Sequence, residues 1–324
     1  SIELILDRKT SDREKEKMSE KNKGNLYILL TALLWSTGGV LIKFIPGNAV
    51  AINGARSLVA FLFFCIYRKS VRIKLNGVIF GAAVCLVMTN LLYVTANKMT
   101  TAANAIVLQY TAPIFVLLWD CLRRKRPPSR QQSLVVAMAF AGMVLFFLDQ
   151  LDGGQILGNL IAIGAGFCFS GVFFLNSLPQ ASSQDSSAAA FLLSFVISIP
   201  FLGDVWKLDG TGWAALLALG VFQVGLAYVF FAKGVKLTSP VSASLIGLLE
   251  AVLNPVWVFL FYGEKMGRFA LIGAGIILLA LVWNTLAGNR ENTAGEDTTK
   301  EDMAVENIAG KSSDGKEPVL EKTR

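Results

Sequence analysis

The chain has 324 residues, 54% of them hydrophobic and 16% charged, with a formal net charge of +7. So much apolar sequence makes lipid the expected solvent, and because Lys and Arg lie in the N-terminal segment and short loops rather than on one amphipathic face, no nucleic acid partner is expected. The absence of histidine from the sequence removes the usual general base and the commonest metal ligand, which argues against an enzyme and against a metal site.

The N-terminal segment, residues 1–25, contains seven basic and six acidic residues and lacks the apolar region of a signal peptide. It is predicted to be a solvated cytoplasmic tail. Met18 lies just before the first apolar window, and residues 1–17 are assigned no function.

Ten apolar windows without clustered charges follow. A helix that crosses about 30 Å of hydrocarbon needs roughly 20 apolar residues and satisfies its own backbone hydrogen bonds. We therefore predict an all-α integral membrane protein with ten transmembrane helices. The windows lie near 26–44, 51–67, 76–96, 102–122, 133–148, 157–177, 188–203, 212–232, 240–262 and 269–287.

Basic residues in the loops orient these helices. The loops at 45–50 and 149–155 contain no Lys or Arg, whereas the loops after the second and fourth windows contain Arg68, Lys69, Arg72, Lys74, Arg123, Arg124, Lys125, Arg126 and Arg130. The pattern is weaker in the second half, where Lys265 and Arg268 lie on an external turn. Both termini are predicted to face the cytoplasm, with the helices in the plasma membrane.

An internal repeat runs through the chain. At an offset of 134, Gly24-Asn25-Leu26 recurs as Gly158-Asn159-Leu160 and Trp35-Ser36 recurs as Phe169-Ser170; at 135, Gly77, Tyr93 and Lys98 recur as Gly212, Tyr228 and Lys233. Because each unit contains an odd number of helices, the second enters the membrane from the opposite side, which makes an inverted repeat of two five-helix units.

The repeat divides the chain into four parts. These are the N-terminal tail 1–25, a first repeat at 26–148, a second repeat at 157–287 and a C-terminal tail at 288–324. The last of these contains six basic and nine acidic residues and is predicted to be a disordered cytoplasmic tail.

The fourth window of each unit carries a polar residue followed by proline. Gln109 precedes Pro113, and Glu250 precedes Pro255. Each proline removes a helical hydrogen bond and disfavours α geometry in the residue before it, so a kink is predicted beside each polar residue. Accommodation of the prolines by neighbouring helices is the alternative.

In their order and spacing, these features resemble the drug/metabolite transporter superfamily of the EamA type, with ten helices in two five-helix units. The resemblance covers about 26–287. It depends on Trp35-Ser36, Arg56, Tyr93–Thr101, Gln109–Pro113, Leu248-Leu249-Glu250, Pro255 and Gly263-Glu264.

One departure concerns the ninth window. Pro255 lies five residues after Glu250 instead of directly after it as in many relatives, which leaves the role of Glu250 open. The resemblance implies secondary transport, commonly export, of a small metabolite such as an amino acid, a nucleoside or a drug.

Four charged residues lie within the windows, and an ionisable group in the membrane is costly. Lys43 and Asp120 lie near window ends and are expected to reach the membrane interface. Arg56 and Glu250 need another explanation. Arg56 is interpreted either as the recognition site for a substrate carboxylate or as a snorkelling or statically paired residue. Glu250 lies near the middle of its window, where removal from water disfavours the charged form, so it could exchange a coupling proton; a static pair with Arg56 is the alternative.

Polar and aromatic residues within the windows complete the predicted pocket. They could bind substrate, or could instead pack and hydrogen-bond the helices together. The predicted substrate-binding or coupling set is Arg56, Glu250, Gln109, Trp35, Ser36, Tyr93, Asn90, Tyr110, Tyr228, Asn254 and Trp257, with helix kinks at Pro113 and Pro255.

The sequence is therefore interpreted as a secondary transporter that alternates access to a central cavity. A membrane-embedded enzyme would need clustered acids or histidines, and a channel or scaffold is disfavoured by the inverted repeat. The sequence contains no Walker motif, so ATP-driven transport and a cofactor are not expected. The expected partners are a small-molecule substrate, the lipid bilayer and a candidate coupling proton, with either a monomer or a homodimer.

Overall fold

The computed structural model describes residues 2–100, 102–148, 156–262 and 267–286, and within these ranges every regular element is helical. Within the described ranges, nine helices are long and apolar enough to cross a membrane, and Arg130–Phe146 is a shorter apolar helix. The prediction of an all-α membrane protein with ten spans is confirmed. The whole predicted C-terminal tail, 288–324, lies outside the described residues.

The first repeat contains five spans, two of them interrupted. Its helices are α1 (Ile2–Ser36) with α2 (Gly38–Lys43), α3 (Ala49–Arg68), α4 (Gly77–Met99), α5 (Ala102–Gln109) with α6 (Ala112–Arg124), and α7 (Arg130–Phe146). Since α1 begins at Ile2, the segment predicted as a tail continues the first span as a helix.

The second repeat has the same number of spans. Its helices are α8 (Ile156–Ser177), α9 (Ser183–Ser198) with η2 (Ile199–Lys207), α10 (Gly210–Ala218) with η3 (Leu219–Leu226) and α11 (Ala227–Leu237), α12 (Pro240–Gly247) with α13 (Leu249–Tyr262), and a last helix at Arg268–Leu286. The chain divides into the units Ser1–Leu281 and Val282–Arg324, and the packing below is that of the first unit.

Short turns with defined caps separate the helices. Asn76 accepts a hydrogen bond from the Ile79 amide at the start of α4, and Ser129 and Gln132 form a capping box at the start of α7. The helices α3 and α6 end at Lys69 and Lys125 in the left-handed conformation, with φ of 51° and 52°. These caps satisfy amide and carbonyl groups that the helix ends leave free.

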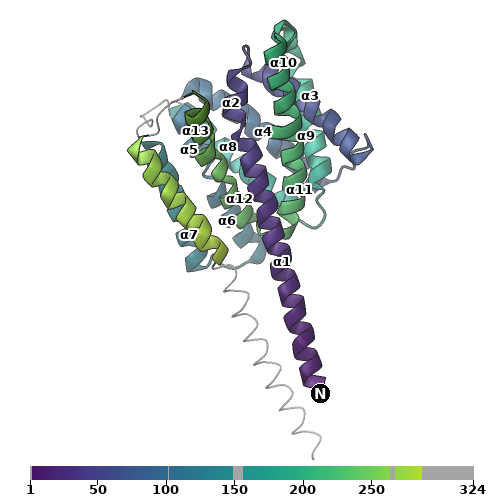
Figure 1. Cartoon of the computed structure of the whole chain (residues 1–324), viewed down its shortest axis with the longest axis vertical. Coiled ribbons are helices and arrows are strands. Elements are labelled where there is room, and N and C mark those ends of the chain that lie inside the picture. Colours follow the sequence, from purple (N-terminus) through teal and green to yellow (C-terminus); the bar gives the residue numbers. More distant parts are fainter. Residues whose placement is uncertain (1, 101, 149–155, 263–266, 287–324) are drawn as a thin grey trace, which may run out of the picture. The chain divides into compact units, whose positions relative to one another are not determined.

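The two faces of the bundle can be told apart by their connections. We call the face where residues 44–48 join the first two spans the distal face, and the face where residues 69–76 join the second and third spans the proximal face. Figure 1 shows α2 and α10 at the end of the bundle away from the N-terminus, which is the distal end.

The packing follows the repeat. The helix α1 packs against α11, as α8 packs against α4, and α1 also contacts α12 and α13 as α8 contacts α5 and α6. Each of these arrangements pairs the first span of one repeat with the third and fourth spans of the other. The two-repeat layout is therefore present in the contacts as well as in the sequence.

Equivalent polar contacts tie the two helix pairs. Thr238 Oγ1 donates to Asn25 Oδ1 between α11 and α1, and Thr100 Oγ1 donates to Asn159 Oδ1 at 2.7 Å between α4 and α8. Glycine permits the close approach beside each bond, since a Cβ on Gly158 would lie 2.8 Å from the backbone of Met99.

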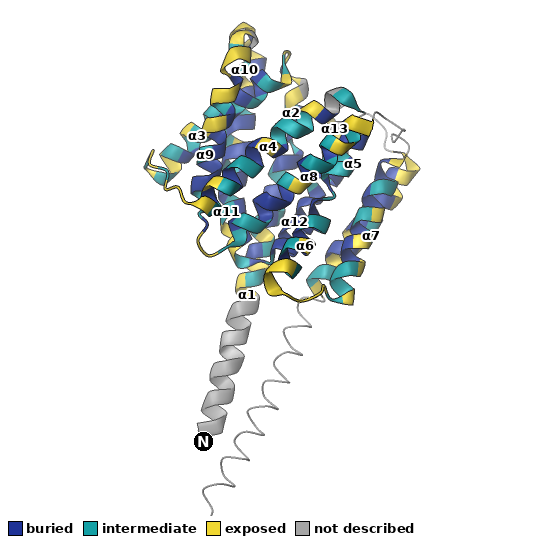
Figure 2. Cartoon of the chain, turned by 180° about the vertical axis from the view of Figure 1, so that it is seen from behind, coloured by how far each residue is buried: buried dark blue, intermediate teal, exposed yellow. Residues whose placement is uncertain are grey.

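Burial follows the helix faces that pack together. Figure 2 shows buried residues concentrated on α8, α9 and α11 and exposed residues on α10 and the connecting turns. Exposed apolar side chains such as Ile66, Leu160 and Leu279 are expected to face lipid, because the hydrocarbon core of a bilayer accommodates apolar side chains.

Candidate functional site

Residues from both repeats enclose a cavity of about 290 Å³. Its polar or aromatic lining residues are Trp35, Asn53, Arg56, Ser57, Thr89, Asn90, Tyr93, Gln109, Tyr110, Phe169, Phe191, Gln223, Tyr228, Glu250 and Asn254. A cavity of this size at the junction of the repeats is where broken-helix transporters place their ligand.

The cavity lies toward the distal face. Gly38 and Ile42 line it from the end of the first span, and Asn53 and Arg56 line it from the start of the second. Tyr93 of the third span and Ile106 of the fourth also line it from the distal halves of their helices.

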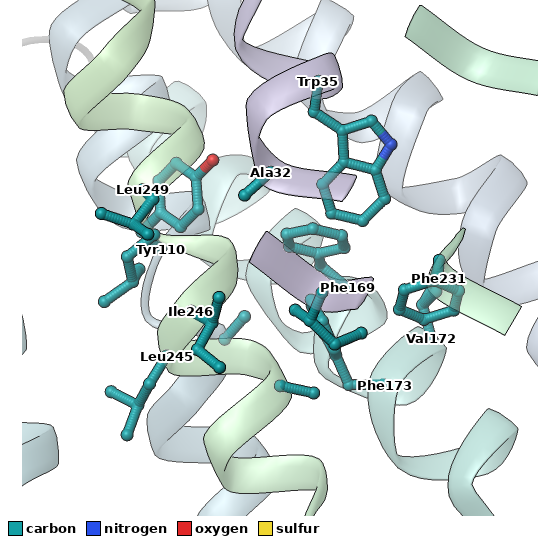
Figure 3. Close-up of a cluster of buried hydrophobic side chains, with 14 of the residues drawn as sticks. Ala32, Trp35, Tyr110, Phe169, Val172, Phe173, Phe231, Leu245, Ile246 and Leu249 are labelled. Atoms are coloured by element: carbon teal, nitrogen blue, oxygen red, sulfur yellow. The ribbon is translucent and has the colours of Figure 1, made fainter. Parts of the chain in front are cut away.

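An apolar layer closes the bundle on the proximal side of the cavity. Phe173 contacts Phe169 and Phe231 edge to face, with ring centroids 5.0 and 5.5 Å apart, and the ring centroid of Trp35 lies 5.9 Å from that of Phe231. Figure 3 shows these rings beside Leu245 and Ile246. Phe173 and Phe231 are 1% and 0% exposed, so they form an aromatic plug under the cavity.

An ion pair between the half-buried Arg68 and the buried Asp185 joins the repeats further toward the proximal face. Asp185 at the start of α9 accepts from Arg68 at the end of α3 and, at 3.2 Å, from the Lys74 backbone amide. The carboxylate thereby fixes the 69–76 connection against the second repeat, which adds a polar closure to the apolar plug.

Arg56 is held by neutral amides. Its Nε and Nη2 donate to Asn53 Oδ1 at 3.2 and 2.8 Å, one helical turn earlier, and its Nη1 donates to Gln223 Oε1 at 3.2 Å. Among the described residues, the ion pairs found within 4.0 Å are Arg68–Asp185 and Arg124–Asp120, so the guanidinium of Arg56 has no carboxylate in direct contact.

Gln223 lies in η3, a π-helical segment that interrupts the eighth span. Its Nε2 donates to the Trp35 carbonyl at 3.3 Å, where the first span is interrupted between α1 and α2. Gly220 lets η3 approach α3 closely, because a Cβ there would lie 3.0 Å from the Arg56 carbonyl. Such π segments recur at functional sites, since they redirect side chains.

Glu250 lies in the second repeat, near the start of α13, and lines the same cavity as Arg56 of the first repeat. Its Oε2 accepts from the Tyr110 hydroxyl at 3.0 Å, at the interruption between α5 and α6. Arg56 and Glu250 lie close enough to interact electrostatically. The cavity therefore contains opposite charges contributed by different repeats.

The structure brings most of the predicted residues together. Ser36 and Trp257 are not among the cavity-lining residues, but Trp257 Nε1 donates to Ser36 Oγ at 2.8 Å and ties α13 to the interruption in the first span. The predicted residues that line the cavity are Trp35, Arg56, Asn90, Tyr93, Gln109, Tyr110, Tyr228, Glu250 and Asn254.

The two prolines differ in position. Pro113 occupies the first turn of α6, directly after the interruption at Tyr110 and Thr111. In the ninth span the interruption falls at Leu248, and α13 continues through Pro255, whose side chain lies outside the description. Proline is tolerated in a first helical turn, where its missing amide hydrogen has no partner to lose.

Asn53 is the main addition to the predicted site, and Gln223 is a polar residue of the eighth apolar window whose partner was not predicted. Asn53 lies at i−3 from Arg56, a spacing that predicts contact on a helix. Gln223 had no such local signal, because its contact joins residues 167 apart in the chain. Gln109 Oε1 is buried without a hydrogen-bond partner, so the lining also has an acceptor available to a ligand.

The fold and the cavity define a multi-pass membrane transporter, and comparisons with known proteins identify its family. The EamA-like transporter family matches residues 22–148 and 156–286. The chain belongs to this family, and its resemblance to the drug/metabolite transporter superfamily is confirmed.

Relatives from distant organisms are similar over most of their length. The chain is 27% identical to "Uncharacterized transporter YwfM" of Bacillus subtilis, covering 84% of this chain and 98% of the relative. It is 23% identical to human "Solute carrier family 35 member G1", covering 82% and 80%. A crystal structure with 19% identity matches 83% of this chain and 98% of its own with a TM-score of 0.71, which supports the fold.

Proposed function

We propose that this protein is a secondary active transporter of the plasma membrane that exports a small metabolite, such as an amino acid, a nucleoside or a drug. Both termini face the cytoplasm in this proposal, so the proximal face is cytoplasmic. The four-part division of the chain is retained, with 26–148 and 157–287 as the repeats that move and the tails at 1–25 and 288–324 outside them.

The asymmetry of the cavity carries the proposal. Residues of both repeats line one cavity displaced toward the distal face, and the aromatic plug of Phe169, Phe173 and Phe231 lies on its proximal side. Two inverted repeats can exchange their conformations, and the exchange would open the opposite face. This favours alternating access around one site rather than a continuous pore.

Arg56 and Glu250 are proposed to recognise charge and to couple transport. Both line the cavity, one from each repeat, and an intramembrane charge is retained where it has a function. Glu250 is proposed to exchange a proton as access alternates, and Arg56 to bind the anionic group of the substrate.

Counterflow in proteoliposomes tests the proposal. Proteoliposomes that contain the full chain are loaded with pooled amino acids, nucleosides or cationic drugs. Uptake of labelled compound is then measured for the wild type, Glu250→Gln and Arg56→Ala. We expect saturable exchange in the wild type and its loss in both variants. Glu20→Gln and Arg126→Ala, which change exposed residues outside the cavity, are matched controls expected to retain exchange.

Different outcomes would overturn different parts of the proposal. Flux that does not saturate and shows no counterflow would indicate a channel. Normal exchange by Glu250→Gln and Arg56→Ala would remove both residues from the mechanism while leaving the transporter intact. Exchange that is independent of pH in the wild type would contradict proton coupling through Glu250.

A further inference from the structure

The donors of Arg56 are only partly used. A guanidinium has five N–H groups, and the bonds to Asn53 and Gln223 take one each from Nε, Nη1 and Nη2. One N–H on each terminal nitrogen therefore remains, and Arg56 lines the cavity. Two N–H groups on the terminal nitrogens of a planar fork are the donors that bind a carboxylate through both oxygens.

The neutral partners of Arg56 preserve its charge. Asn53 and Gln223 supply amide oxygens, so they fix the guanidinium from two sides without neutralising it. Gln223 is 7% exposed and is itself fixed by the Trp35 carbonyl. Arg56 is half-buried, and a cation held only by neutral acceptors in such surroundings gains from an anionic ligand, because a lower dielectric than that of water strengthens the pair.

The charge balance of the lining limits the ligand to a single negative charge. Among the described residues that line the cavity, Arg56 is the one base and Glu250 the one acid. A dianion such as a phosphate ester would bring more negative charge than one guanidinium compensates, and Glu250 would repel it. Aromatic and apolar lining residues such as Phe169, Phe191 and Val224 provide surface for an uncharged body.

From these observations we infer that Arg56, positioned by Asn53 and Gln223, forms a carboxylate subsite, and that the transported metabolite is an organic monocarboxylate. The identity of the transported metabolite rests on the proposed function, whereas the subsite itself is a property of binding. Gln223 and Asn53 are positioning residues here, since they act through the guanidinium.

Matched ligands test the subsite on the wild-type protein. Binding of phenylacetate, phenylacetamide, phenethylammonium and phenyl phosphate to the purified full chain is measured by thermal unfolding in detergent and by quenching of tryptophan fluorescence. Acetate, butyrate and indole-acetate extend the range of carboxylate size. We expect phenylacetate to bind about tenfold or more tightly than its amide, its cationic analogue and the phosphate ester.

Gln223→Glu places a carboxylate oxygen where the amide oxygen now accepts from Arg56. The variant is expected to occupy the guanidinium permanently and to weaken phenylacetate binding by about tenfold or more, with phenylacetamide binding unchanged. Gln131→Glu on α7, outside the cavity lining, is the matched control and is expected to bind as the wild type does. Asn53→Asp makes the same test from the other side of Arg56 if Gln223→Glu does not fold.

Three results would overturn the inference. They are equal binding of the amide or the phosphate ester, no binding of any carboxylate in the series, and full carboxylate binding by both Gln223→Glu and Asn53→Asp. The proposed function fails separately. Carboxylate binding without counterflow would support the subsite and contradict transport, whereas counterflow confined to compounds without a carboxylate would support transport and contradict the subsite.

Discussion

At the scale of single residues, neutral donors and acceptors hold the intramembrane charges of this transporter. Tyr110 donates to Glu250 across the repeats, and Asn53 and Gln223 accept from Arg56. Uncompensated charges would be costly in the membrane interior. Neutral partners stabilise the charged side chains and leave them able to exchange ligands or protons.

Removal of one such partner has a measurable cost. Tyr110→Phe keeps the ring contact with Phe169 but deletes the hydroxyl that donates to Glu250. We expect the free energy of unfolding to fall by about 0.5–2 kcal/mol, since hydrogen bonds within membranes contribute in this range. Unfolding in mixed micelles with increasing dodecyl sulfate measures it.

Tyr27→Phe is the control for this substitution. The ring of Tyr27 stacks on Phe230, and its hydroxyl is outside the cavity. An equal loss of stability in both variants would show that the Tyr110 hydroxyl contributes nothing through Glu250.

At the scale of helices, interruptions and glycines shape the site. The first, fourth, eighth and ninth spans are each interrupted beside the cavity, at Thr37, Tyr110, η3 and Leu248. Each interruption frees backbone groups where a polar cavity can satisfy them. Glycines such as Gly166, whose Cβ would lie 2.7 Å from the Gln109 carbonyl, let whole helices approach these interruptions.

Two glycines in the last helix are expected to differ in how much their substitution by alanine destabilises the protein. A Cβ on Gly273 would lie 2.4 Å from the Phe146 amide nitrogen of α7, whereas Gly275 has open space around it. We expect Gly273→Ala to lower the free energy of unfolding by about 1–3 kcal/mol, because the helices must separate. Gly275→Ala on the same helix is expected to change it by no more than about 0.5 kcal/mol.

The same unfolding assay in mixed micelles decides between the two glycines. Equal effects of Gly273→Ala and Gly275→Ala would contradict the close contact between the fifth and tenth spans.

At the scale of the whole bundle, the repeats are equivalent in topology but not in side-chain size. At the repeat offsets of 134 and 135, Phe173 corresponds to Gly39 and Phe231 to Ala96. These two large residues of the second repeat form part of the plug on the proximal side, where the first repeat has small ones at the equivalent positions. The third plug residue, Phe169, corresponds to the equally large Trp35. The difference in side-chain volume at the other two positions favours closure of the proximal face, while the cavity lies toward the distal one.

The paired helices are expected to move as units. In a background without the free cysteines Cys65, Cys85, Cys121 and Cys168, a short thiol cross-link between cysteines at Asn25 and Thr238 joins α1 to α11, which already pack together. Counterflow should continue, because the link preserves an existing pair. A cross-link between cysteines at Phe173 and Phe231 should stop it, because the plug can no longer open.

Reduction of the link is the control in both cases and should restore counterflow where it was lost. Continued exchange with the Phe173 and Phe231 positions linked would show that the plug is not a gate. Loss of exchange with the Asn25 and Thr238 positions linked would show that α1 and α11 separate during transport.

The surrounding solvent, the number of spans and the repeat could be predicted from the sequence. The spans follow from the lengths of the apolar windows. The repeat follows from matches along the sequence, such as Gly24-Asn25-Leu26 with Gly158-Asn159-Leu160. The sequence also singled out Arg56 and Glu250, because a charge within an apolar window is visible without any contact.

Which residues meet depends on the packing of the helices. The contact of Arg56 with Gln223 and that of Tyr110 with Glu250 join residues 167 and 140 apart, and no periodicity along the chain encodes such distances. The interruption at Leu248 rather than Pro255 has the same origin. Neighbouring helices can satisfy the backbone around a proline, so packing rather than local sequence places the break.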